Sequence, residues 1–224
     1  MTVRSVNLDV EPPSPRVSPA PARIGPNAVL QTLRALRELE GEVVERLVSL
    51  SAELPEPLPP GMIPEAWFVH LVCAVRKALP GPRAEAVLRR AGRYTADYVR
   101  EHRIPKAFRL LLHLLPARLS TLLLLIAFRR HAWTFAGAGR FSYQGPFPGI
   151  ILLDGCPTCR AECTAGMRGH GGAYYEAAFE RLLALASPSL RVREEACQAQ
   201  HAASCRYRIL LGDVAAERTP CASF

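Results

Sequence analysis

The apolar residues from Asn27 to Leu50 recur every three or four positions, which is the spacing of one face of an amphipathic helix. Gly41 lies within this run and is a candidate interruption. Proline-rich segments follow, and they end helices because proline lacks the backbone N–H. Between them the same period predicts further helices over residues 64–79, 83–102, 108–115 and 117–128. We therefore expect a helical half that spans about residues 23–130.

The pattern changes after residue 130. Trp133 and Phe135 lie on one side of a glycine-rich turn and Phe141 and Tyr143 on the other, which predicts a β-hairpin over residues 131–144. Residues 149–155 are a candidate strand, residues 174–187 a helix, and residues 190–198 and 205–212 two strands joined by a turn. Because strand–helix–strand alternation is absent, the order predicts an α+β fold, with the α+β half over about residues 131–212.

The two ends of the chain are expected to lie outside this domain. Residues 1–22 contain the segment VEPPSPRVSPAPA, whose prolines and serines have nothing to pack against, so a disordered arm is predicted. The folded domain is expected over residues 23–212 and a tail over residues 213–224. The N-terminus shows no basic segment followed by an apolar one, so we expect no secretory signal and a cytoplasmic location.

The formal net charge is +8, and nearly all of the basic excess is arginine. Such a bias often reflects a GC-rich genome, so we expect no nucleic-acid partner. The longest apolar run, residues 119–128, has about half of the roughly 20 residues that a membrane span needs. A buried core helix is predicted there, and peripheral membrane contact through this arginine-flanked stretch is the alternative.

Six of the seven cysteines lie after residue 150. Their spacing is Cys156-x2-Cys159-x3-Cys163, followed by Glu194-x2-Cys197-x7-Cys205. Thiolates and a carboxylate at these spacings can converge on one zinc ion, which prefers four tetrahedral ligands. Two alternatives stay open. In one, Cys197 and Cys205 are small buried hydrophobes on adjacent strands and residues 156–163 form an exposed loop without a metal. The other is an iron–sulfur cluster.

A second candidate site combines basic and aromatic residues: Arg129, Arg130, His131, Trp133 and Phe135. A histidine can coordinate the metal of a tetrapyrrole, aromatic rings can cover its flat face, and arginines can pair with its propionates. The alternative is a histidine satisfied within the core. The glycine-rich motifs of dinucleotide and nucleoside triphosphate sites are absent from the sequence, so any electron donor is unknown.

Several segments, taken together, resemble the bacteriochlorophyll 4-vinyl reductase family (BchJ) of the V4R domain superfamily. The resemblance covers about residues 22–212. Its most specific parts are HAWTFAGAG and the block that runs from FERL to CRYRI. The segments are residues 22–31, 92–105, 111–119, 127–141 and 173–197, closing with Cys205-Arg-Tyr-Arg-Ile.

The resemblance implies a V4R fold, similar to that of vesicle-tethering TRAPP subunits and of the sensor domains of phenol-responsive activators, and it implies a homodimer. In the sensor relatives, zinc is held by a cysteine ahead of a helix and by an E-x2-C-x7-C pattern after it. Glu194, Cys197 and Cys205 match that pattern. Gly171 stands where the earlier cysteine is expected. We place Cys163 in the site as its replacement, with Cys159, Cys156 and His170 as the alternatives.

The family name implies reduction of the C8-vinyl (4-vinyl) group of divinyl protochlorophyllide or a related Mg-porphyrin. Such a reduction needs electrons that a cofactor usually carries, and no cofactor motif is seen. We therefore expect a bacteriochlorophyll biosynthesis protein that binds or delivers the Mg-tetrapyrrole to other enzymes of the pathway, in the cytoplasm or peripheral to the photosynthetic membrane. The alternative is a zinc-stabilised V4R regulatory or scaffold module without catalysis.

Overall fold

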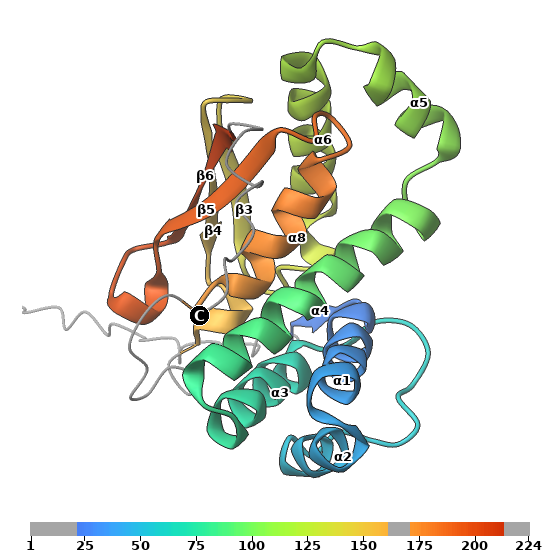
Figure 1. The fold of residues 1–224 in the computed structure, drawn as a ribbon, viewed down its shortest axis with the longest axis vertical. Coiled ribbons are helices and arrows are strands. Elements are labelled where there is room, and N and C mark those ends of the chain that lie inside the picture. Colours follow the sequence, from blue (N-terminus) through green and yellow to red (C-terminus); the bar gives the residue numbers. More distant parts are fainter. Residues whose placement is uncertain (1–21, 161–170, 213–224) are drawn as a thin grey trace, which may run out of the picture.

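The computed structural model describes residues 22–160 and 171–212, and their fold is α+β, as predicted (Figure 1). The expected arm at residues 1–22, apart from its last residue, and the expected tail at 213–224 lie outside the described residues, as do Cys163 and His170. The helices before the sheet are α1 (Asn27–Glu40), α2 (Glu42–Ser51), α3 (Glu65–Ala78), α4 (Gly81–His102), α5 (Lys106–Leu114) and α6 (Ala117–His131).

Proline marks the start of most of these helices. A proline has no N–H to donate and a fixed φ, so it suits the position where a helix begins. Gly41 separates α1 from α2 with a φ of 89°, which confirms the predicted interruption. The residues immediately before α1, α3, α4, α5 and α6 are Pro26, Pro64, Pro80, Pro105 and Pro116.

The predicted hairpin over residues 131–144 is wrong. His131 ends α6, and residues Ala132–Thr134 form the 3-10 helix η1 rather than a strand. Only the second half of the segment is a strand, β3 (Arg140–Gln144), and it pairs with β4 (Gly149–Asp154). The glycines at 137 and 139 turn the chain into β3, so the real hairpin connection is the next one, at residues 145–148.

The main sheet is four-stranded and antiparallel, with the order β3-β4-β6-β5. The last two strands are β5 (Leu190–Ala196) and β6 (Cys205–Leu211), which confirms both predicted strands. The register pairs Leu153 of β4 with Cys205 of β6, and a shift between Glu194 and Ala196 interrupts the β5–β6 ladder. The shift lies in the Glu194-x2-Cys197 segment and changes the direction of the chain there.

Helix α8 (Ala173–Leu183) lies between the sheet and α4 (Figure 1). Phe179 of α8 is the centre of an aromatic cluster, with ring centroids 5.5–6.1 Å from Phe128, Phe135, Phe141, Tyr175 and Tyr207. Aromatic pairs at these distances contribute about 0.5–1.5 kcal/mol each beyond their buried area. The cluster fixes α8 on the sheet.

The far end of the molecule is made by α5 and α6, away from α1, α2 and α3 (Figure 1). Leu124, Leu125 and Phe128 of α6 are buried, so one face of the longest apolar run packs in the core, while Leu119 and Ile126 are exposed. In the described part of the chain, no helix is both long enough and apolar enough to cross a membrane.

Near α3, a short two-stranded sheet ties the start of the domain to that helix. Strand β1 (Arg23–Ile24) pairs antiparallel with β2 (Ile63–Pro64).

Candidate functional site

Four buried donor groups converge beside the end of the sheet: the thiols of Cys159, Cys197 and Cys205 and the carboxylate of Glu194. Their ligand atoms all lie within 4.8 Å of one another. Cys159 ends the 3-10 helix η2 (Pro157–Cys159), which follows β4. Glu194 lies on β5, Cys197 follows it, and Cys205 begins β6. We call these four residues the Cys3Glu cluster.

The sulfur spacing in the cluster fits a tetrahedral metal. The Sγ atom of Cys159 lies 3.4 Å from that of Cys197 and 3.5 Å from that of Cys205. Zinc–sulfur bonds of about 2.3 Å in a regular tetrahedron give a sulfur–sulfur edge of about 3.8 Å. A shift of a few tenths of an ångström would bring the thiolates onto one ion. Three thiols and one carboxylate are also the donor types that zinc accepts.

The turn between β5 and β6 contacts one of the donors and the start of η2. The Gln198 N–H donates to Cys205 Sγ at 3.3 Å, and the Gln198 side-chain carbonyl accepts from the Cys156 N–H at 2.9 Å. Gln198 therefore connects the turn to the start of η2. The sheet brings together cysteines that are far apart in the sequence.

Gly171 lies against the same cluster. Its N–H donates to Cys197 Sγ at 3.1 Å. A Cβ atom built on Gly171 would be 2.9 Å from Cys159 Sγ and 3.4 Å from Cys197 Sγ. A side chain at position 171 would thus point at the cluster, and Cys159 Sγ occupies the space next to it. This placement favours Cys159 over Cys163 as the residue that replaces the missing cysteine, although Cys163 lies outside the described residues.

Burial and mutual hydrogen bonds control the protonation of the cluster. Burial, together with the neighbouring Cys197, raises the pKa of Glu194 to about 8. Hydrogen bonds among the cysteines raise the pKa of Cys205. Burial opposes ionisation of Cys156, but its hydrogen bonds with Cys159, Cys205 and Thr158 outweigh it and bring the Cys156 pKa well below its usual value. A bound cation would offset the electrostatic repulsion between these groups in their ionised forms.

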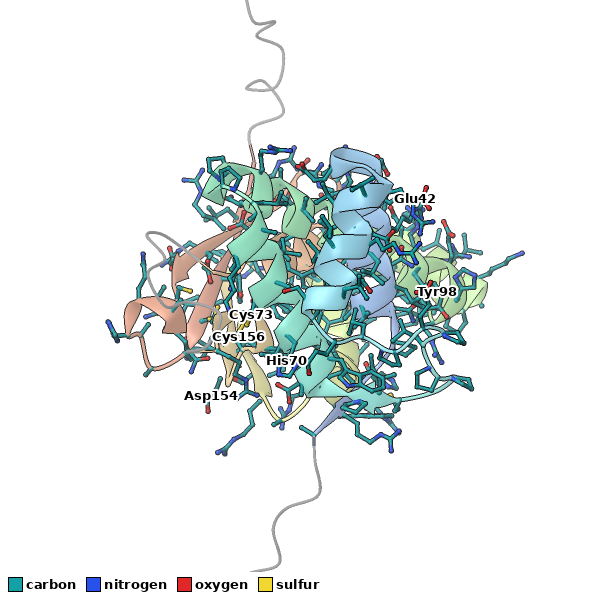
Figure 2. All side chains as sticks on the ribbon, turned by 90° about the horizontal axis from the view of Figure 1, so that it is seen from below. Glu42, His70, Cys73, Tyr98, Asp154 and Cys156 are labelled. Atoms are coloured by element: carbon teal, nitrogen blue, oxygen red, sulfur yellow. The ribbon has the colours of Figure 1, made fainter. Side chains whose placement is uncertain are left out.

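Arg76 of α3 supplies a positive charge beside the cluster. Its guanidinium donates to the backbone carbonyls of Thr158, at 2.5 Å, and Gly171, at 2.7 Å. Burial lowers the pKa of Arg76, while the charges of Cys159, Cys156, Cys197 and Glu194 oppose that shift. Arg76 thereby fixes two segments of the site and offsets part of their negative charge. Figure 2 shows sulfur atoms around the labelled Cys156, where η2 lies beside α3.

Tyr207 of β6 adds a polar atom next to the cluster. Its hydroxyl is buried and has no hydrogen-bond partner among the described residues. The Tyr207 hydroxyl and Glu194 Oε1 lie 2.4 and 2.3 Å from the Cβ position that Gly172 lacks, so both face the same small space. The Gly172 N–H donates to Glu194 Oε2 at 3.0 Å. Glycine at position 172 therefore leaves room for the carboxylate.

The predicted tetrapyrrole-contact residues divide into two groups. Arg129, Arg130 and His131 are exposed at the end of α6, and Trp133 on η1 is 57% exposed. Phe135 instead packs in the core, with its ring centroid 6.1 Å from that of Phe179, and its carbonyl accepts a hydrogen bond from the Tyr175 hydroxyl at 2.7 Å. The structure places the first four at one exposed end and assigns Phe135 a packing role.

Glu65 connects this exposed segment to the cysteine loop. The side chain is buried at the start of α3, accepts from the Ala138 N–H at 2.9 Å and forms an ion pair with Arg160, the residue after Cys159. Gly137 has a φ of 59°, and a Cβ there would lie 2.5 Å from Glu65 Oε2. The AGAG turn therefore needs glycine at 137.

Sequence reasoning did not identify Glu65 or Arg76 as parts of the site. Each reaches its partners across more than 70 positions of the sequence, because Glu65 and Ala138 are 73 residues apart and Arg76 and Thr158 are 82 apart. An acidic residue in the first turn of a helix and a basic residue in the last are ordinary features of helices. They gave no signal of a long-range contact.

The fold and the Cys3Glu cluster define an α+β protein with a metal-type donor site. No protein-family model matches the chain, but two curated proteins are similar to it over most of its length. Both are named bacteriochlorophyll synthase 23 kDa chain. The protein of Cereibacter sphaeroides is 36% identical over 190 residues, covering 84% of this chain and 90% of its own. That of Rhodobacter capsulatus is 35% identical over 198 residues, covering 85% and 90%. The chain belongs to the family of these 23 kDa chains.

Proposed function

We propose that this protein acts in bacteriochlorophyll biosynthesis by binding a Mg-tetrapyrrole and delivering it at the C8-vinyl reduction step, with zinc holding the domain together. The observation that carries the pathway is the similarity, over more than four fifths of the chain, to two proteins named for bacteriochlorophyll synthase. The vinyl step and divinyl protochlorophyllide as ligand rest on the family resemblance of the sequence.

The proposed zinc ligands are Cys159, Glu194, Cys197 and Cys205. Four protein ligands leave no open position for a water or a substrate, which is the arrangement of structural zinc sites. Bound zinc would crosslink η2, β5 and β6. Three thiolates and a carboxylate carry four negative charges, two more than the positive charge of the ion. The guanidinium of Arg76 offsets part of this excess negative charge. The site is therefore proposed as a stabilising centre and not as the source of electrons.

The proposed pigment contact is the exposed end of α6 with η1. His131 and Trp133 are accessible there, beside Arg129 and Arg130. An imidazole can coordinate magnesium in a macrocycle and an indole can stack on its face, while guanidinium groups pair with carboxylates. The Gly25 N–H donates to the Thr134 carbonyl at 2.9 Å, so η1 is held to β1 and its side chains are presented in a fixed arrangement.

The test is titration of zinc-analysed protein with divinyl protochlorophyllide, followed by absorbance, and then addition of NADPH. We expect a shifted absorbance band on binding and no conversion to the monovinyl product. The His131→Ala variant should lose the shift. The matched control is His70→Ala, because His70 is also exposed but lies on α3 (Figure 2).

The outcomes separate the alternatives. Conversion without any further protein would make this chain a reductase and overturn the carrier proposal. No binding by the zinc-loaded protein would favour a V4R regulatory or scaffold module without catalysis. Binding that persists in His131→Ala would remove that residue as the magnesium ligand and leave pigment binding in place. The proposed homodimer is tested by sedimentation of the purified protein. The pairing with other bacteriochlorophyll biosynthesis enzymes is tested by sedimentation of its mixtures with them, with and without pigment.

A further inference from the structure

Helix α5 has two apolar faces, and only one of them is buried. Leu112 is fully buried, and Phe108 packs against the core from the same side. The other face repeats at i, i+3, i+4 and i+7 and is exposed to solvent. Its three leucines are Leu110, 62% exposed, Leu111, 43% exposed, and Leu114, 75% exposed, and Ala107 completes the face. A helix in this position needs only one apolar face for folding.

The apolar face continues into the next helix. Leu119, near the start of α6, is 43% exposed, and α5 and α6 are in contact. In Figure 1, α5 lies at the edge of the molecule, at the end opposite α2 and α3. The exposed leucines of α5 therefore belong to a helix at the periphery of the domain. We call Ala107, Leu110, Leu111, Leu114 and Leu119 the α5 face.

The charges around the α5 face have one sign. The sequence contains no Asp or Glu between Glu101 and Asp154. Lys106, at the start of α5, and Arg118, at the start of α6, are exposed at the two ends of the face, while the half-buried Arg109 lies on another side of α5. None of these three forms an ion pair with a carboxylate in the described part of the chain. Exposed leucines flanked by cations are typical of helical segments that lie in the interface of an anionic membrane.

We propose that the α5 face docks this protein on an anionic lipid bilayer, with the leucines inserted between headgroups and the basic side chains on the lipid phosphates. Charge complementarity selects this occupant. Two copies of the chain facing each other through α5 would bring like charges together, whereas an anionic surface neutralises them. The inference does not depend on the proposed pigment or zinc site.

The experiment is co-sedimentation of the full chain with vesicles of phosphatidylcholine alone or of phosphatidylcholine mixed with phosphatidylglycerol. We expect binding to the mixed vesicles, much weaker binding to phosphatidylcholine, and loss of the difference at high salt, because salt screens the charges. Leu110→Ser/Leu114→Ser should weaken binding roughly tenfold or more, since two largely exposed leucines no longer bury apolar area. Lys106→Gln/Arg118→Gln should weaken it by roughly 25-fold, or about fivefold per cation.

Helix α2 offers a matched control. Leu47 and Leu50 are 62% and 67% exposed, close to Leu110 and Leu114, but the first turn of α2 carries Glu42 and Glu45. Leu47→Ser/Leu50→Ser should leave vesicle binding unchanged. All variants change exposed side chains, and circular dichroism checks that they fold.

Two results would overturn the proposal. One is equal binding by the α5 and α2 variants, which would mean that the α5 face makes no special contact. The other is sedimentation of the vesicle-free protein as a dimer that Leu110→Ser/Leu114→Ser dissociates, because a second copy would then cover the face.

Discussion

The contact between position 171 and Cys159 Sγ makes a specific prediction about the fourth metal ligand. If Cys159 replaces the cysteine that the resemblance places at position 171, a cysteine moved back to 171 should restore a site that has lost Cys159. The geometry permits the exchange because the Cβ of residue 171 would lie 2.9 Å from Cys159 Sγ and 3.4 Å from Cys197 Sγ. The variants are Cys159→Ala, Gly171→Cys and the double variant.

The expected magnitudes follow from linkage. A ligand at about 1,000 times its dissociation constant stabilises the folded state by about 4 kcal/mol. For a chain of this size, that corresponds to a melting temperature roughly 8–16 °C higher with zinc than with a chelator. Cys159→Ala should lose most of this difference. Gly171→Cys alone should also be destabilised, since its new side chain meets the Cys159 sulfur. The double variant should recover zinc and most of the melting temperature.

The measurements are zinc per protein by atomic absorption and thermal unfolding with and without a chelator. Cys156→Ala is the matched control, because Cys156 is buried beside the cluster without belonging to it, and this variant should keep its zinc. A Cys159→Ala protein that still holds one equivalent of zinc as tightly would refute the assignment. So would a double variant no better than Cys159→Ala.

Three further predictions concern the surroundings of the sites. Gly137→Ala should lower the free energy of unfolding by roughly 2–5 kcal/mol in urea titrations, since it combines a positive φ with displacement of the buried Glu65 carboxylate. The control Gly145→Ala, which has a similar φ of 68° without that clash, should cost about 1–2 kcal/mol. Arg76→Met should weaken zinc binding in competition with a chelator, and unchanged affinity would exclude the proposed charge compensation. Burial raises the pKa of three tyrosines, so the folded state holds their phenol protons more tightly than the unfolded state does. Their contribution to the free energy of unfolding is therefore complete below about pH 10 and decreases above it. In alkaline titrations, tyrosinate absorbance from these residues should rise only with loss of circular dichroism, and a rise before unfolding would contradict their burial. They are Tyr174, Tyr175 and Tyr207.

The sequence by itself determined most of the elements. Apolar spacing located the helices within a few residues, and the prolines fixed where they start, because both signals act over one or two turns of the chain. The strands predicted at residues 190–198 and 205–212 correspond to β5 and β6. The same reasoning failed at residues 131–135, where apolar alternation suggested a strand. There the chain continues from α6 into η1, and Phe135 joins the aromatic cluster around Phe179.

Residue types and short spacings also identified Glu194, Cys197 and Cys205 as candidate ligands, because these three lie within one pair of neighbouring strands and the turn that joins them. The choice among the earlier cysteines needed the tertiary structure. The pairing of β4 with β6 and the packing of η2 against α3 bring Cys159 to the cluster, where Gly171 faces it. Arg76 and Glu65 join their partners from more than 70 positions away. Local sequence patterns record the period of a helix or strand, whereas contacts between distant segments depend on how the complete core packs.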